Sequence, residues 1–186
     1  MKYLFISLIA LFMVACGDAP KMENTEVVKA QTGDYDPEAK LAELGITLPD
    51  VSPPVANYVN TVRTGNLVFI SGKGPQKDDG TYIEGKVGAD LTIEEGYAAA
   101  RLTAVQSLAA LKAELGNLNK VKRVVKVLGM VNAVPDFRDQ PKVVNGYSDL
   151  MVEVFGDRGK HARSAVGMGS LPSNIAIEVE VIIEVE

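Results

Sequence analysis

The sequence predicts an α+β domain in which a single mixed β-sheet carries two helices on one face. Three observations indicate this class. Strand-like and helix-like segments follow one another in an irregular order, residues 174–186 alternate in polarity to the end of the chain, and residues 92–116 carry both a helix start signal and a stop signal.

The predicted domain begins with a short helix and a hairpin. Asp36 and Pro37 form a helix start and Gly45 a stop, so residues 36–45 are expected to form a short peripheral helix. The β-rich runs 58–63 and 67–71 flank Thr-Gly-Asn, a spacing typical of a β-hairpin. The Gly-rich residues 72–90 predict a loop with one short strand near 81–83.

Two longer helices are predicted along the chain, one before and one after a long strand. Thr92 and Glu95 form a capping box, and helical spacing of apolar residues continues to Gly116. The Val-rich residues 121–134 predict a strand, and residues 143–155 predict a second helix that stops at the following glycine.

The last two predicted strands are 163–168 and 174–186. In the second, the odd-numbered residues from Ile175 to Val185 are all apolar and are expected to face the core. The opposite face of the sheet would carry a mixture of apolar and charged residues, which suggests burial in an oligomer.

Composition restricts the possible functions. The chain has 186 residues, 47% of them hydrophobic, which suits one globular domain with an appended segment. Its 24 acidic against 19 basic residues give a net charge of −5, which argues against a nucleic-acid partner. One Cys and one His exclude a disulfide framework and a Cys- or His-rich metal site. Neither a metal nor a cofactor is expected.

The N-terminus has the pattern of a signal peptide. Lys2 is followed by the uncharged residues 3–14, a run shorter than the roughly 20 residues of a membrane-spanning helix. Residues 13–16 (Met-Val-Ala-Cys) resemble a bacterial lipobox, which implies cleavage before Cys16 and lipidation of Cys16. The alternative is a plain secretory signal.

The predicted organisation is therefore a signal peptide at 1–15, a lipidated Cys with a flexible tether at 16–34, and a domain at 35–186. The expected location is the cell envelope of a bacterium, lipid-anchored or periplasmic. Contact with the membrane would occur through the lipid anchor only.

Several motifs are similar, in order and spacing, to the RidA/YjgF family. They are Tyr58, 69–75 (FISGKGP), 145–147 (NGY), 162–166 (ARSAV), Leu171-Pro172 and 177–180 (IEVE). The match covers about 53–186, and residues 85–92 and 99–101 look like a divergent subgroup. The resemblance implies a chorismate-mutase-like fold and a homotrimer whose sheets face inward, with sites in the clefts between subunits.

The resemblance also implies an activity, the hydrolysis of 2-imino or 2-enamino acids to 2-oxo acids and ammonia. Arg163 matches the arginine that holds the substrate carboxylate, and Glu178 matches the acidic residue that positions or deprotonates the attacking water. The other positions that match the family's pocket are Tyr58, Ser71, Gly72, Asn145 and Ala165. The alternatives are an intersubunit ion pair for Arg163 and an ordinary solvated or ion-paired strand residue for Glu178.

Two positions depart from the deaminase pattern. Ala165 stands where the deaminases commonly have Cys, and His161 stands where many have Pro. His161 either lines the same cleft or is an ordinary surface or capping residue. Two functions are left open: a deaminase, and a trimeric binder of small carboxylate ligands without turnover. The ribonuclease or translation-inhibitor activity attached to some family names is disfavoured by the negative charge.

Overall fold

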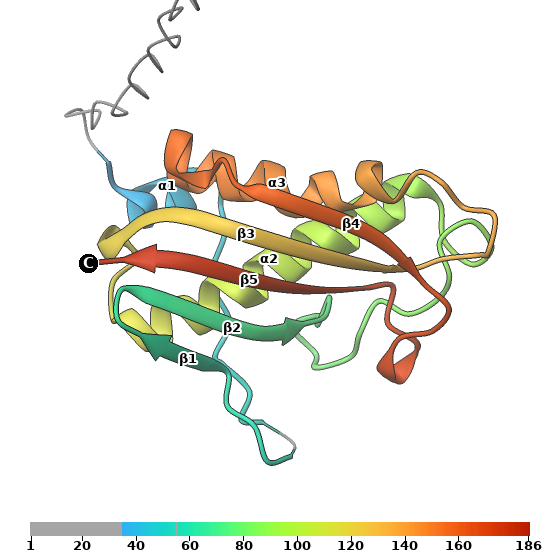
Figure 1. Ribbon diagram of the computed structural model, residues 1–186, viewed down its shortest axis with the longest axis horizontal. Helices are drawn as coiled ribbons and strands as arrows, with labels where there is room; N and C mark the ends of the chain where they lie inside the picture. Colours follow the sequence, from blue (N-terminus) through green and yellow to red (C-terminus); the bar gives the residue numbers. More distant parts are fainter. Residues whose placement is uncertain (1–34, 55) are drawn as a thin grey trace, which may run out of the picture. The chain divides into compact units, whose positions relative to one another are not determined.

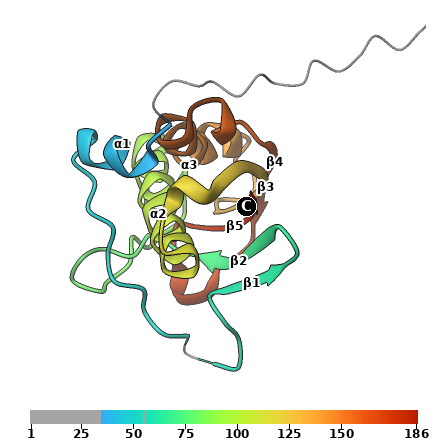
Figure 2. The ribbon, with the colours of Figure 1, turned by 90° about the vertical axis from the view of Figure 1, so that its left-hand side faces the viewer.

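The computed structural model describes residues 35–54 and 56–186. These residues form a five-stranded sheet in the order β1-β2-β5-β3-β4, with helices packed on one face (Figures 1 and 2). Of these strands, only β3 and β4 pair in parallel. The predicted mixed sheet with helices on one face is therefore confirmed.

The five strands overlap the main segments that were predicted to form strands. They are β1 (Thr61–Thr64), β2 (Leu67–Lys73), β3 (Val121–Asn132), β4 (Ala162–Met168) and β5 (Ile177–Val185). The hairpin of β1 and β2 is confirmed. The strand expected near 81–83 is absent from the described residues: Tyr82 and Glu84 make only isolated bridges, because the surrounding glycines turn the backbone at Gly80 and Gly85 with positive φ.

The three α-helices in the described part of the chain are α1 (Pro37–Glu43), α2 (Ile93–Leu115) and α3 (Gln140–Phe155). The Thr92–Glu95 capping box closes the start of α2, and Gly116 ends it in the left-handed conformation. Helix α3 begins three residues before the predicted start, with Pro141 in its first turn. No helix in the described region has the length and hydropathy to span a membrane.

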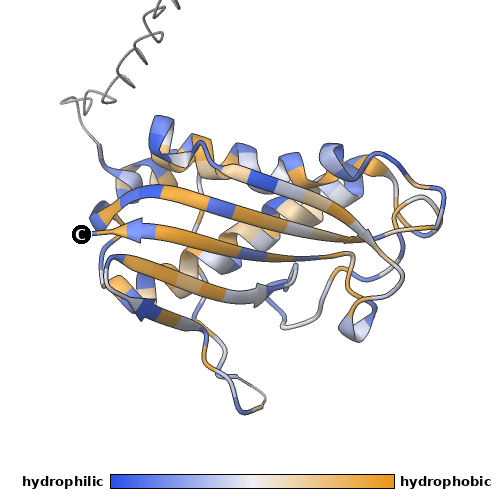
Figure 3. Ribbon diagram, in the orientation of Figure 1, coloured by the Kyte–Doolittle hydropathy of each residue, from blue (hydrophilic) through white to orange (hydrophobic). Residues whose placement is uncertain are grey.

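The core lies between the sheet and the two long helices. The odd-numbered residues of β5 are buried there, as predicted, and α2 and α3 contribute Leu108, Leu111, Tyr147 and Leu150. The other face of the sheet has no covering layer of described residues. Apolar and polar residues are interspersed along the strands (Figure 3). Among the apolar side chains on the uncovered face, Phe69 is 40% and Val166 38% exposed.

Short 3₁₀ turns connect the elements: η1 (Leu118–Lys120), η2 (Gly156–Gly159) and η3 (Pro172–Asn174). Because η3 occupies the start of the predicted last strand, β5 begins at Ile177 rather than at 174. The predicted signal peptide, Cys16 and the tether lie outside the described residues.

Candidate functional site

Arg163 lies on the edge strand β4 with its side chain against α3. Its Nη1 donates to Asn145 Oδ1 at 2.9 Å and to Ser148 Oγ at 3.0 Å. These two bonds use both hydrogens of Nη1. In the described region Nε and Nη2 have no hydrogen-bond partner, so one edge of the guanidinium keeps the paired donors that fit a carboxylate.

Helix α3 supplies the two acceptors because Asn145 and Ser148 are three residues apart and share one face of the helix. The structure thus brings Asn145, one of the positions that match the family's pocket, into contact with Arg163. Ser148 was missed by the sequence analysis, although its spacing from Asn145 is a usable signal. Ala165 lies two residues after Arg163 on the same face of β4 and packs against the core.

His161 belongs to the same group of side chains. Its Nε2 is 3.0 Å from Ser148 Oγ, and its Nδ1 is 2.6 Å from the carbonyl oxygen of Gly159. Burial and the nearby Arg163 charge lower the pKa of His161, and the hydrogen bond to Gly159 opposes this effect. We call Arg163, Asn145, Ser148 and His161 the arginine group.

A second group surrounds Glu178 on β5. The Glu178 carboxylate lies against the backbone of Gly72, where an added Cβ would be 2.0 Å from Oε1. Burial, and secondly the charge of Glu180, raise the pKa of Glu178. A raised pKa suits a carboxylate that accepts a proton during catalysis.

Ser71 and Tyr58 lie on the side of β2 away from β5. Ser71 Oγ donates to the carbonyl of Val59 at 2.6 Å, which holds the segment before β1 next to β2. The adjacent Tyr58 is 50% exposed. We call Glu178, Gly72, Ser71 and Tyr58 the glutamate group.

The two groups do not meet within one chain. Arg163 pairs in register with Val127, which is fully buried under the helices, whereas Glu178 pairs with Met130 on the uncovered face. Residues that are opposite one another on adjacent strands share a face of the sheet. Arg163 and Glu178 therefore face opposite sides of the sheet within one chain.

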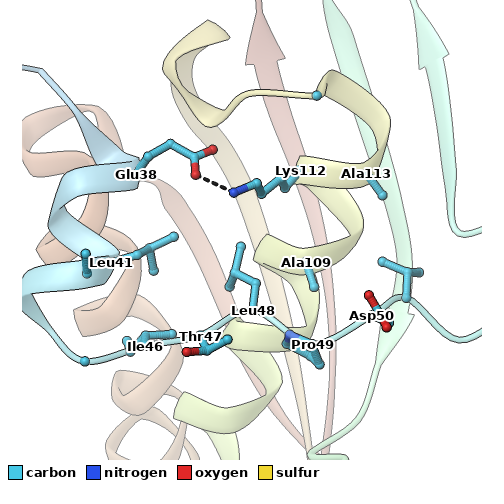
Figure 4. A pocket seen from close by; sticks show the side chains of 14 residues that line it. Glu38, Leu41, Ile46, Thr47, Leu48, Pro49, Asp50, Ala109, Lys112 and Ala113 are labelled. Atoms are coloured by element: carbon cyan, nitrogen blue, oxygen red, sulfur yellow. Dashed lines mark hydrogen bonds and ion pairs between the residues drawn. The ribbon is translucent and has the colours of Figure 1, made fainter.

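A separate groove of about 850 Å³ lies between α1, residues 45–51 and the end of α2 (Figure 4). Two of its three charged residues are paired with each other: Lys112 donates to Glu38, which also accepts from the backbone N–H of Leu118, while Asp50 has no ion-pair partner among the described residues. None of the predicted site residues lines this groove.

Comparison with known proteins decides the family. Residues 38–185 match the family model described as "YjgF/chorismate_mutase-like, putative endoribonuclease". The chain belongs to the RidA/YjgF family. Its mixed sheet with helices on one face is the chorismate-mutase-like fold of that family, and family members are generally oligomeric.

Individual relatives show the range within the family. The chain is 46% identical to Protein TCP17 of Trypanosoma cruzi, over 78% of this chain and 92% of that protein. It is 29% identical to a 2-iminobutanoate/2-iminopropanoate deaminase of Dermatophagoides farinae, over 76% of this chain and 95% of that protein. The crystal structure of Atu1372 from Agrobacterium tumefaciens matches with a TM-score of 0.75 and 44% identity, over 81% of this chain and 94% of that one.

Proposed function

We propose that this RidA/YjgF protein hydrolyses 2-imino or 2-enamino acids to 2-oxo acids and ammonia. The observation that carries the proposal is the held guanidinium of Arg163, whose Nε and Nη2 edge suits a substrate carboxylate. The 29% identical deaminase of Dermatophagoides farinae supports the same chemistry.

The reaction needs orientation more than a strong nucleophile. Arg163 holds the carboxylate, and Glu178 takes a proton from a water whose oxygen adds to the imine carbon. Glu178 returns that proton to the nitrogen, which gives a carbinolamine. The hydroxyl proton of the carbinolamine then also passes to the nitrogen as the C–N bond breaks, so that the nitrogen leaves as ammonia and the carbon becomes the carbonyl of the 2-oxo acid. No metal, cofactor or redox step enters this balance.

The site is proposed to form between copies of the chain in a homotrimer. Arg163 and Glu178 face opposite sides of one sheet, so a complete site takes the arginine group from one copy and the glutamate group from its neighbour. The uncovered face of the sheet supports such an assembly, because its exposed apolar side chains, among them Phe69 and Val166, would be buried in a closed ring.

A second candidate function is a trimeric binder of small carboxylates that performs no turnover. The observation in its favour is that the arginine group is complete without Glu178. The two functions differ in what Glu178 does. A Glu178→Gln variant of a deaminase loses turnover and keeps affinity for 2-oxobutanoate, whereas in a binder the wild type itself shows no turnover.

The test measures ammonia and 2-oxo acid release from freshly generated 2-imino acids, beside calorimetric binding of 2-oxobutanoate. Arg163→Lys should lose both, because a point charge does not reproduce the planar pair of donors. The matched control is Arg158→Lys, whose guanidinium lies 3.7 Å from the Tyr35 ring centroid and outside both groups. Equal loss in both variants would contradict a specific role for Arg163.

We further propose a location in a bacterial cell envelope, with lipid on Cys16 as the only attachment to the membrane. The support is the lipobox-like residues 13–16. Labelled palmitate should be incorporated into the wild-type chain and not into Cys16→Ser. Labelling of both, or of neither, would overturn the lipoprotein assignment.

A further inference from the structure

His161 is the one histidine of the chain, and it lies two residues before Arg163. Its half-buried ring touches the helix that holds Arg163 and the turn η2 that precedes β4. The ring and the guanidinium share a neighbour, since Ser148 Oγ is 3.0 Å from His161 Nε2 and 3.0 Å from Arg163 Nη1.

The chemistry of these contacts assigns the protons on neutral His161. A carbonyl oxygen only accepts, so Nδ1, 2.6 Å from the Gly159 carbonyl, carries the hydrogen. Nε2 is then an acceptor and takes the hydroxyl proton of Ser148. With its proton directed at the imidazole, the Ser148 hydroxyl presents a lone pair to Arg163 Nη1.

We propose that His161, acting through Ser148, is a positioning residue for Arg163 and makes the binding of carboxylates at Arg163 depend on pH. While His161 is neutral, the directed hydroxyl of Ser148 holds Nη1 and leaves the Nε and Nη2 edge for the ligand. This inference rests on the proposed function, because it takes Arg163 as the carboxylate-binding residue.

Protonation of His161 reverses the hydrogen bond to Ser148. Nε2 then donates to Ser148 Oγ, which still accepts from Arg163. The hydroxyl group of Ser148 keeps its hydrogen and can donate it to another acceptor. The imidazolium also adds a positive charge beside the guanidinium. Both changes favour an anionic ligand, so carboxylates bind more tightly as the pH falls through the His161 transition.

The elements around His161 carry several charged groups. They include Arg163 on β4, Arg158 and the Asp157–Lys160 ion pair at η2, Asp149 and Glu153 on α3, and Lys126 on β3. Asp149, Glu153 and Lys126 have partners of their own in Tyr97, Arg101 and Ser164. Among the charged groups, only Arg163 shifts the pKa of His161, and it acts with burial to lower it.

The first experiment measures the tautomer and the titration of the His161 imidazole directly. Because the chain has one His, a two-bond ¹H–¹⁵N spectrum of the full chain without a histidine tag shows a single imidazole. The expected result is the Nδ1–H tautomer at pH 8 and a titration midpoint below that of a solvent-exposed histidine, which rises in Arg163→Gln and not in the control Arg158→Gln. An Nε2–H tautomer, or a midpoint that is unchanged in Arg163→Gln, would overturn the proposal.

The second experiment measures the affinity for 2-oxobutanoate, a stable carboxylate probe, between pH 8 and pH 5. The wild type should bind about tenfold more tightly at the lower pH, the scale of one added charge-assisted hydrogen bond. His161→Gln, which keeps a polar group but does not titrate, should show a flat profile. Ser148→Ala should weaken the pH dependence, because it removes the hydrogen-bond link and leaves only the charge of the imidazolium, while Ser148→Thr, which retains the hydroxyl, should restore it.

The two experiments separate the failure of this inference from that of the proposed function. A wild type that binds no 2-oxobutanoate at any pH contradicts the proposed function, and it also removes the pH-dependent binding inferred here. Binding that is independent of pH, or equally pH-dependent in wild type and His161→Gln, leaves the proposed function standing and overturns the role of His161.

Discussion

The Glu178 carboxylate occupies the space that a side chain at position 72 would need. An alanine Cβ there would lie 2.0 Å from Oε1 and 2.9 Å from Cδ of Glu178. These distances are far inside van der Waals contact, so either the carboxylate or the backbone of β2 must move. Gly72 thereby ties the shape of β2 to the position of the proposed catalytic carboxylate.

The first prediction concerns this pair. Gly72→Ala should reduce kcat at least about tenfold, because misplacing a reacting group by about 1 Å costs one to two orders of magnitude. Measuring kcat in Gly72→Ala, Glu178→Ala and the double variant checks it. Since both changes act on one carboxylate, the double variant should be no worse than Glu178→Ala, and additive losses would contradict the coupling.

The second prediction concerns the pH profile. If Glu178 accepts a proton during turnover, kcat rises with pH through the pKa of Glu178, which burial and secondly the charge of Glu180 raise. Glu180→Gln removes the repelling charge, so the acidic limb of the kcat profile should move to lower pH. Glu184→Gln, farther along β5, should leave the limb in place; a shift in both variants would point to a general charge effect.

The third prediction concerns the packing of α2 against α3. A Cβ at Gly146 would lie 2.0 Å from the carbonyl oxygen of Tyr97, so the helices approach at backbone distance. Gly146→Ala should lower the free energy of unfolding by about 3 kcal/mol, the upper range for overpacking. Urea denaturation measures this. Gly169→Ala is the control because a Cβ there meets nothing within 4 Å, and its stability should be unchanged.

The fourth prediction concerns Tyr147, whose buried hydroxyl makes no hydrogen bond among the described residues. The neighbouring Ser107 hydroxyl donates instead to the Thr103 carbonyl. Burial accordingly raises the pKa of Tyr147. Tyr147→Phe should increase the free energy of unfolding by about 1 kcal/mol, because it removes an uncompensated buried polar group.

Tyr97→Phe gives the contrasting case for the same helices. The Tyr97 hydroxyl donates to Asp149 at 2.9 Å, so its loss should lower the free energy of unfolding by about 0.5–1 kcal/mol. Thermal denaturation of the two variants side by side distinguishes them. A loss of stability in Tyr147→Phe would show that its hydroxyl has a partner.

Elements with local signals could be predicted from the sequence. The capping box at Thr92 and the glycine at 116 define both ends of α2, and strict alternation defines the faces of β5. Residues 72–90 carry no comparable signal. Their path depends on long-range contacts, such as the donation from Lys86 Nζ to Asn132 and to the Gly169 carbonyl.

Only part of the site could be predicted, because some of its contacts have no local signal in the sequence. Alternation along β5 places Glu178 away from the core, but β4 has no clear alternation, so the face of Arg163 could not be assigned. The contact of Ser148 with both His161 and Arg163 depends on how α3 packs beside β4. Contacts of this kind are set by tertiary structure and leave no periodic pattern in the sequence.

In the proposed homotrimer, a complete site takes Arg163 from one copy and Glu178 from another. The most direct test mixes two inactive variants, Arg163→Ala and Glu178→Ala, by co-refolding at equal concentration. Random assembly of a closed ring should restore about one quarter of the wild-type deaminase activity, because each intact site needs the intact half from each variant. Activity that stays at the level of the separate variants in a mixed oligomer would contradict the account.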